Sequence, residues 1–278
     1  MSAGTPRPTF PGPAAIPYAS VTRFVWGDET AGRVQDWIYV SSDKIHQLVF
    51  ELPPGGGFRH SDEHRTIFAA DEIYYVLEGS LFLSNPETGE VHRLRPGEAA
   101  FFRKDTWHHG FTGGAEPVRV LEYFSPPPSQ GTSRAYARTK PNLTNPKYTQ
   151  DPWIGRWPMG QAEAREKFTM RVVREADWLW RLEGETSSTP VALLASTEHL
   201  TVGKIRLLPG QRTDARMHAG DLSLYVTEGS LRIETQEPFQ VGARDGFYAP
   251  AGTRYVFGNP SDAPAELIFG IAPGIKRP

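Results

Sequence analysis

The sequence predicts an all-β protein built from two domains in tandem. The first observation is an internal repeat, because the heptapeptide Tyr75-Val-Leu-Glu-Gly-Ser-Leu81 returns as Tyr225-Val-Thr-Glu-Gly-Ser-Leu231. A repeat at so long a spacing indicates two copies of a whole domain, since solenoid repeats have much shorter periods. The second observation is the rhythm of the chain. Its 27 Gly and 25 Pro separate short β-branched and aromatic segments, as in antiparallel sandwiches and barrels.

The strands are expected at short segments bounded by turn residues, such as Pro53-Pro-Gly-Gly-Gly57 and Pro96-Gly97. In the first half the predicted strands are 36–40, 47–52, 73–77, 81–84, 99–103 and 118–124. In the second half strands resume at 171 and continue at 191–194, 204–208, 222–226, 231–235, 246–249 and 267–271.

These segments predict four parts of the chain. They are an N-terminal arm (1–35), a first domain (36–128), a Pro-rich linker (129–170) and a second domain (171–278). The linker is too long for a simple turn, and we expect it to pack across both domains. It also contains the one short helix that the sequence predicts, at 161–168.

Composition excludes several classes of function. The formal net charge of −2 argues against nucleic acid or an anionic membrane as the main partner. The chain contains no cysteine, so disulfides, thiolate ligands and cysteine nucleophiles are excluded together. No apolar run approaches the roughly 20 residues of a membrane helix, and we expect a cytoplasmic protein.

Metal-binding residue types gather around the first copy of the repeat only. They are His60, Asp62, His64, Glu72, His108 and His109, whereas the second copy keeps His218 alone. Side chains at i, i+2 and i+4 of a strand share one face, so His60, Asp62 and His64 would all point inward if their segment is extended. Divalent first-row metals prefer such nitrogen and oxygen ligands. Three other histidines, His46, His92 and His199, are interpreted as surface or satisfied core residues.

The spacing around Glu72 resembles the cupin superfamily. Gly79 follows Glu72 after six intervening residues, and His108 follows Gly97 at the spacing of the family's second motif, with Arg103 and Asp105 replacing its Pro and Gly. In the second half Pro209-Gly210 and His218 match the first motif, with Leu222 in the Glu position, and Pro250-Ala-Gly252 matches the second, with Tyr255 in the His position. The resemblance implies two cupin (jelly-roll) β-barrels in tandem, with a metal site in the first barrel only.

The resemblance implies one divalent metal ion, and two ligand sets are open. They are His60, His64, Glu72 and His108, or the same set with Asp62 in place of His60. The first is preferred because imidazole outranks aspartate as a ligand for Fe, Ni, Cu or Zn. Fe(II) is favoured, with Mn, Ni, Zn or Cu as alternatives. Leu222, Tyr255 and Arg216 are interpreted as core filling and a structural polar contact, so the second site is expected to be empty.

Three functions follow from this interpretation. The leading one is a mononuclear iron dioxygenase acting on a small phenolic or unsaturated substrate, with Tyr74 or His109 transferring protons. Aromatic residues near the predicted metal (Tyr74, Phe82, Phe102, Trp107 and Phe111) favour such a substrate. The alternatives are a redox-neutral isomerase, lyase or cyclase with the metal as Lewis acid, and a non-catalytic binding protein. Monomer and homodimer are both open. Trp178 and Trp180 are expected in the core or a domain interface.

Overall fold

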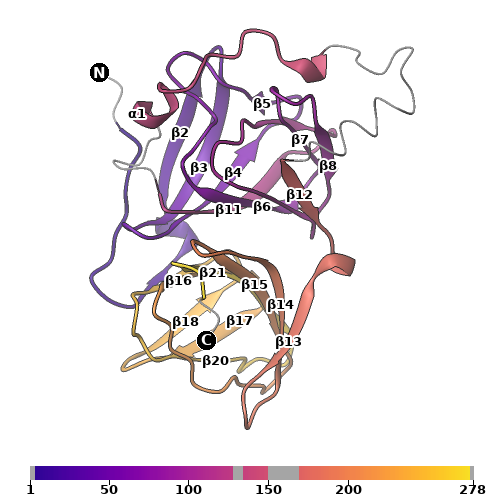
Figure 1. The fold of residues 1–278 in the computed structure, drawn as a ribbon. Coiled ribbons are helices and arrows are strands. Elements are labelled where there is room, and N and C mark those ends of the chain that lie inside the picture. Colours follow the sequence, from indigo (N-terminus) through magenta and orange to yellow (C-terminus); the bar gives the residue numbers. More distant parts are fainter. Residues whose placement is uncertain (1–3, 128–133, 150–168, 276–278) are drawn as a thin grey trace.

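The computed structural model describes residues 4–127, 134–149 and 169–275, and it consists of two β-barrels (Figure 1). In the N-terminal barrel a seven-stranded sheet of order β12-β9-β6-β11-β4-β3-β2 faces a four-stranded sheet of order β5-β10-β7-β8. Its strands are β2 (Thr22–Asp28), β3 (Gly32–Ser41), β4 (His46–Leu52), β5 (Gly57–Phe58), β6 (Asp71–Glu78), β7 (Leu81–Ser84), β8 (Val91–Leu94), β9 (Ala99–Phe102), β10 (His109–Thr112), β11 (Val118–Ser125) and β12 (Met170–Val173).

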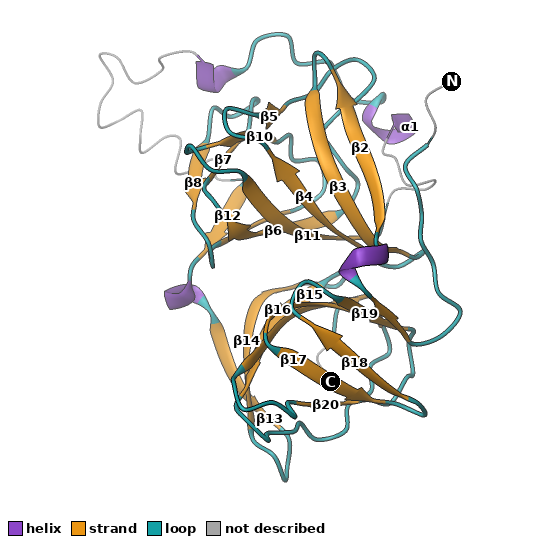
Figure 2. Cartoon of the chain, turned by 180° about the vertical axis from the view of Figure 1, so that it is seen from behind, coloured by secondary structure: helices purple, strands orange, loops and turns teal. Residues whose placement is uncertain are grey.

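The C-terminal barrel repeats this plan with a seven-stranded sheet of order β1-β19-β16-β21-β15-β14-β13 and a three-stranded sheet of order β18-β17-β20 (Figure 2). Its strands are β1 (Ala14–Ile16), β13 (Leu179–Glu183), β14 (Thr189–Ser196), β15 (Thr201–Leu207), β16 (Asp221–Glu228), β17 (Ser230–Glu234), β18 (Pro238–Gly242), β19 (Gly246–Ala249), β20 (Val256–Gly258) and β21 (Ala265–Ala272). The short helices are η1 (Tyr18–Ser20), α1 (Arg134–Ala137), η3 (Lys147–Thr149) and η4 (Glu175–Asp177). Two tandem all-β barrels are what the sequence predicted.

The repeated heptapeptide occupies the same place in both barrels. Its first residues end β6 and β16, and its glycine makes the following turn with a positive φ of 76° at Gly79 and 71° at Gly229. A Cβ at Gly79 would lie 2.3 Å from the Pro117 carbonyl oxygen, and one at Gly229 would lie 2.5 Å from that of Pro264. The repeat therefore preserves a turn that only glycine fits.

Each barrel receives an edge strand from the segment that precedes the other barrel. β1 pairs with β19 of the C-terminal sheet, and β12 pairs with β9 of the N-terminal sheet. The predicted boundaries at 35 and 171 therefore shift, because the arm contains β1 and β2 and the strand beginning near 171 belongs to the first barrel. Periodicity identifies a strand but not its partner. The predicted helix at 161–168 lies outside the described residues.

One hydrophobic cluster is shared by the two barrels, and each barrel also has a core of its own. A single buried cluster joins Val49 and Tyr123 of the first half to Val202, Tyr225 and Ile268 of the second. Tyr123 also donates a hydrogen bond from its hydroxyl to the Ile268 carbonyl oxygen at 3.0 Å. Within the described residues, none of the helices is long and apolar enough to cross a membrane.

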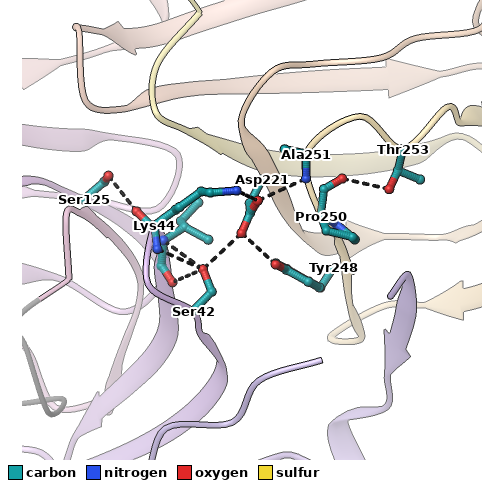
Figure 3. A network of polar contacts seen from close by, with 9 residues as sticks. Ser42, Lys44, Ser125, Asp221, Tyr248, Pro250, Ala251 and Thr253 are labelled. Carbon is teal, nitrogen blue, oxygen red and sulfur yellow. Dashed lines mark hydrogen bonds and ion pairs between the residues drawn. The ribbon is translucent and has the colours of Figure 1, made fainter. Parts of the chain in front are cut away.

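Equivalent aspartates at the starts of β6 and β16 connect the barrels in both directions. Asp221 accepts hydrogen bonds from Ser42 Oγ at 3.2 Å and from Lys44 Nζ at 2.7 Å, both in the first half (Figure 3). Its counterpart Asp71 accepts one from Thr197 Oγ1 of the second half at 2.6 Å. Ser42 and Thr197 each begin a tight turn between two strands. The contact between the barrels is therefore made by equivalent residues of the two repeats.

Candidate functional site

Buried polar side chains gather inside the N-terminal barrel, on the inward face of its large sheet. Glu72 and Tyr74 of β6 alternate inward, and Glu122 of β11 lies opposite Tyr74 in the strand register. Asp36 of β3 is also buried, on the same sheet. Aromatic side chains surround this group, including Phe50, Phe58 and Phe102, which make edge-to-face contacts with Tyr74 at centroid distances of 5.1, 6.5 and 5.2 Å.

His108 completes the group from the loop that precedes β10. Its Nδ1 lies 3.3 Å from the Thr106 carbonyl oxygen, which can only accept, so Nδ1 carries the proton and Nε2 is free to accept. The Tyr74 hydroxyl then donates to His108 Nε2 at 3.0 Å. Glu72 Oε1 lies 3.9 Å from the same nitrogen and is buried without a hydrogen-bond partner. An orphaned buried carboxyl oxygen is costly, and such groups cluster at functional sites.

The surroundings favour neutral side chains in this interior. Burial raises the pKa of Glu72 to about 7, against the opposing effect of the neighbouring Glu122 and Tyr74 side chains. Burial, with the nearby charge of Glu72, raises the pKa of Glu122 well above its usual range, and burial also raises that of Asp36. Burial lowers the pKa of His108 to about 4. Among the described residues, no lysine or arginine forms an ion pair with these carboxyl groups.

The four predicted metal ligands do not converge, and this corrects the prediction from sequence. Glu72 and His108 lie close together, but His60 Nδ1 contacts His109 Nε2 at 2.7 Å and its Nε2 contacts the Leu143 carbonyl oxygen at 2.7 Å. His64 Nδ1 contacts Asp28 Oδ2 at 3.1 Å. The reason is that only β5 (Gly57–Phe58) of this segment is extended, so the strand parity that would turn His60 and His64 inward ends after Phe58.

The alternative ligand set fails for the same reason. The Asp62 side chain is exposed and accepts a hydrogen bond from Asn142 Nδ2 at 2.8 Å. In the described part of the chain no three His, Asp or Glu side chains lie where they could hold one ion. Glu72 Oε1 and His108 Nε2, at 3.9 Å, are close enough to share a cation. Two protein ligands fall short of the three that catalytic zinc and non-haem iron sites use, so the four-ligand centre does not fit this structure.

His109, predicted as a proton-transfer residue, is fully buried and hydrogen-bonds to side chains outside the group of Glu72, Tyr74 and His108. Its Nε2 contacts His60 Nδ1, and its Nδ1 contacts the Tyr148 hydroxyl at 2.7 Å. The Leu143 carbonyl oxygen accepts a hydrogen bond from His60 Nε2, and the His60 backbone N–H donates to His109 Nε2 at 3.3 Å. Tyr74, the other predicted proton-transfer residue, does lie beside Glu72 and His108.

The described part of the linker, 134–149, runs along the N-terminal barrel (Figure 1). Arg65 donates hydrogen bonds to the carbonyl oxygens of Ala137 and Lys140, and Lys140 forms an ion pair with Asp105 at 2.8 Å. A small apolar cluster of Ile67, Trp107, Ala137 and Leu143 seals the contact. This part covers the loops that carry His60 and His108, and it was predicted to span both domains.

In the C-terminal barrel the equivalent positions are occupied by packing residues. Leu222 and Tyr255 are buried in the core of this barrel, as expected. Arg216 Nη1 forms an ion pair with Glu183 Oε2 at 3.1 Å, and the His218 ring lies 5.9 Å from that of Tyr255. The polar group of the N-terminal barrel therefore has no counterpart at these positions.

Sequence reasoning missed Glu122 and Asp36, although a signal for Glu122 was present. Glu122 stands in the predicted strand 118–124, whose neighbouring residues are mostly apolar. A carboxylate on such a strand is seldom fully buried without a partner, and this anomaly marks it as a site residue.

His46 was interpreted as a surface or satisfied core residue, and it is buried but not satisfied. Its ring stacks on Phe124 with a centroid distance of 4.4 Å, and its Nδ1 has no hydrogen-bond partner. Burial, with a smaller contribution from Arg7, lowers the pKa of His46 from 6.5 to about 3.

This pKa predicts an acid-sensitive contribution to stability. Between pH 6.5 and 3 the unfolded chain binds a proton at His46 that the folded chain does not, so folding weakens as the pH falls. Relative to His46→Phe, the parent should lose roughly 2 kcal/mol more unfolding free energy between pH 7 and pH 5. Denaturant titrations at both pH values measure this difference. His199→Phe, at an exposed position, is the control, and an equal pH dependence in parent and His46→Phe would contradict the prediction.

Comparisons with known proteins agree with the architecture. A family model described as a cupin domain matches residues 48–124 and again 203–271. A search of curated proteins returned no match. Among solved structures, a putative glyoxylate-induced protein from Pseudomonas aeruginosa is similar at a TM-score of 0.67 and 17% identity, with 100% of this chain and 96% of that chain covered.

Two further solved structures have the same fold. AerE from Microcystis aeruginosa is similar at a TM-score of 0.61 and 11% identity, covering 91% of this chain and 97% of that chain. An oxalate decarboxylase variant from Bacillus subtilis is similar at a TM-score of 0.60 and 13% identity, covering 97% and 78%. At these identities the likeness establishes the two-barrel fold and not the reaction.

Proposed function

Since the chain belongs to the cupin domain family, whose model matches just over half of its residues, we propose that it is an enzyme with its active centre inside the N-terminal barrel. The proposed reaction is a redox-neutral proton transfer, such as an isomerisation, on a small organic molecule that carries a carbonyl or phenolic oxygen. The observation that carries the proposal is the buried, unpartnered Glu72 Oε1 beside the hydrogen-bonded pair of Tyr74 and His108.

In this reaction Glu72 is the group that moves the proton. Its carboxylate takes a proton from a carbon next to the substrate carbonyl, and the electron pair of the broken C–H bond passes to the carbonyl oxygen as an enolate. The Tyr74 hydroxyl turns from His108 to donate a hydrogen bond to that oxygen. Glu72 then returns the proton to a different carbon, so that the product is an isomer and no oxidant is needed.

The neighbouring side chains support this role. Glu122, which holds its own proton, hydrogen-bonds to Glu72 and shares the cost of a buried negative charge. Phe50, Phe58 and Phe102 exclude water and provide flat apolar surfaces for an aromatic or unsaturated substrate. Glu72, Tyr74 and His108 are all buried, so a substrate reaches them only after neighbouring side chains move.

An iron dioxygenase is the second candidate. The observation in its favour is the 3.9 Å separation of Glu72 Oε1 and His108 Nε2, the two members of the expected ligand set that meet. Bound iron would supply the activation of O₂ for insertion into a phenolic substrate. Metal analysis of the purified parent, Glu72→Ala and His108→Ala tests it. About one equivalent in the parent and almost none in both variants would favour this candidate.

Deuterium exchange separates the candidates. The parent protein is incubated in D₂O, under argon and with a chelator, with a panel of small phenols and unsaturated carbonyl compounds, and mass spectrometry follows the compounds. A proton-transfer enzyme should place deuterium on carbon in at least one compound without O₂ or added metal. Conversion that requires iron and consumes O₂ would overturn the proposal in favour of the dioxygenase. Binding of a compound without exchange or conversion would instead indicate a non-catalytic binding protein.

A further inference from the structure

The outer strand of the C-terminal sheet exposes an unusual amount of apolar surface. β13 (Leu179–Glu183) ends the seven-stranded sheet, so one side of its backbone pairs with β14 and no other described strand pairs with its free side. Leu179, Trp180 and Leu182 expose 59%, 54% and 74% of their surface. Trp180 was predicted to lie in the core or a domain interface, and only Trp178 packs partly against the shared core.

The other three outer strands of the two large sheets differ from β13. β1 has three residues and β12 has four, and neither has an exposed large apolar side chain. β2 is longer, but only Val25 among its large apolar residues is strongly exposed. Proteins shorten or charge their edge strands to prevent association, so a long apolar edge indicates a binding surface.

The charges on β13 permit one partner in particular, a second copy of the strand. Arg181 and Glu183 share one face of the strand, while Trp180 and Leu182 share the other. A single charge on an edge strand normally opposes pairing. Here the opposite charge stands two residues further on. Glu183 is paired within the chain with Arg216 at 3.1 Å and lies 4.0 Å from Arg181, and an antiparallel copy adds an Arg181–Glu183 contact across the pair.

One register brings the opposite charges together. In an antiparallel pair related by a two-fold axis, Leu182 opposite the partner's Leu182 places Arg181 opposite the partner's Glu183, and the same contact occurs twice. Shifting the pair so that Arg181 faces the partner's Arg181 brings like charges together, which is destabilising. Strands on the two sides of such a contact form one continuous sheet.

We infer that two copies of this chain associate through antiparallel pairing of β13, with Leu182 at the two-fold axis. The contact joins the two C-terminal sheets edge to edge and buries Trp180 and Leu182 of both copies. The contact lies on the C-terminal barrels, because β13 runs along the side of that barrel (Figure 1).

Light scattering on a sizing column tests the inference. The parent should elute with twice the monomer mass at micromolar concentration. Leu182→Lys, which places like charges at the axis, should raise the dimer dissociation constant at least tenfold, and Arg181→Glu should do the same by facing the partner's Glu183. The control is Leu208→Lys, since Leu208 is also exposed (57%) but lies outside β13. A monomeric parent, or a Leu182→Lys dimer as tight as the parent, would overturn the inference.

A thiol test locates the axis independently of any loss of fold. The chain has no cysteine, so Leu182→Cys introduces a single thiol. Under mild oxidation this variant should form a disulfide-linked dimer on a non-reducing gel, and Leu208→Cys should not. Equal cross-linking of the two variants, or none at Leu182→Cys, would contradict the register.

Discussion

Glu72→Gln is expected to lower the turnover number of the proposed reaction by about 10²–10⁴-fold, the usual contribution of a general base. The amide has the same shape as the carboxyl group, but it cannot take a proton from carbon. The substitution also removes the ionisable group from a fully buried position without leaving a cavity, so the midpoint of thermal unfolding should not fall. The rate of deuterium exchange and a melting curve measure the two effects.

The matched control is Glu63→Gln, which changes a carboxylate on the surface. Glu63 forms an ion pair with Arg138 at 3.0 Å with both side chains largely exposed, so its loss should leave turnover unchanged. The turnover number of Glu122→Gln should lie between those of Glu72→Gln and Glu63→Gln, because Glu122 touches Glu72 and not the substrate. Full turnover by Glu72→Gln would end the assignment of Glu72 as the proton-transfer group.

The fold could be predicted almost entirely from the sequence, because its signals are local. The repeated turn glycines, the alternating segments and the spacing of Glu72, Gly79 and His108 each report on short stretches of chain. What could not be predicted is which sheet accepts a strand. β1 and β12 cross between the barrels, and β13 lies on an edge, through pairing choices that periodicity does not encode.

The sequence predicted the positions of only some residues of the candidate site. Glu72, Tyr74 and His108 stand on or beside regular strands, where parity fixes the direction of a side chain. His60 and His64 stand in an irregular loop, where parity has no meaning, and contacts distant in sequence decide their direction. Asp28 holds His64 and Leu143 holds His60, and neither contact had a sequence signal.

The substitution with the largest expected effect on stability is Asp221→Ala, which should lower the unfolding free energy by roughly 3 kcal/mol. Asp221 is buried between the barrels and accepts hydrogen bonds from Lys44 Nζ at 2.7 Å, the Tyr248 hydroxyl at 2.6 Å and the Ala251 amide at 3.0 Å (Figure 3). Removing the Asp221 carboxylate leaves the buried hydroxyls of Tyr248 and Ser42 without their hydrogen-bond acceptor. The value is below that for a fully buried ion pair because Lys44 is partly exposed to water.

The pH dependence of Asp221→Ala distinguishes this network from mere packing. Burial would raise the pKa of Asp221, but hydrogen bonds from Lys44, Tyr248 and Ala251 outweigh it and lower the pKa below 3.8. The carboxylate therefore stabilises the fold above its unfolded pKa, and this contribution is lost as the pH falls through the folded value. Calorimetry should show that the difference in unfolding free energy between parent and Asp221→Ala becomes smaller in acid.

The control is Asp43→Ala, which removes a 3.0 Å ion pair with Arg7. The Asp43 side chain is 97% exposed, so this substitution should lower the unfolding free energy by less than about 1 kcal/mol. If Asp221→Ala costs no more than Asp43→Ala, the reciprocal aspartates do not hold the barrels together, and the shared apolar core alone joins them.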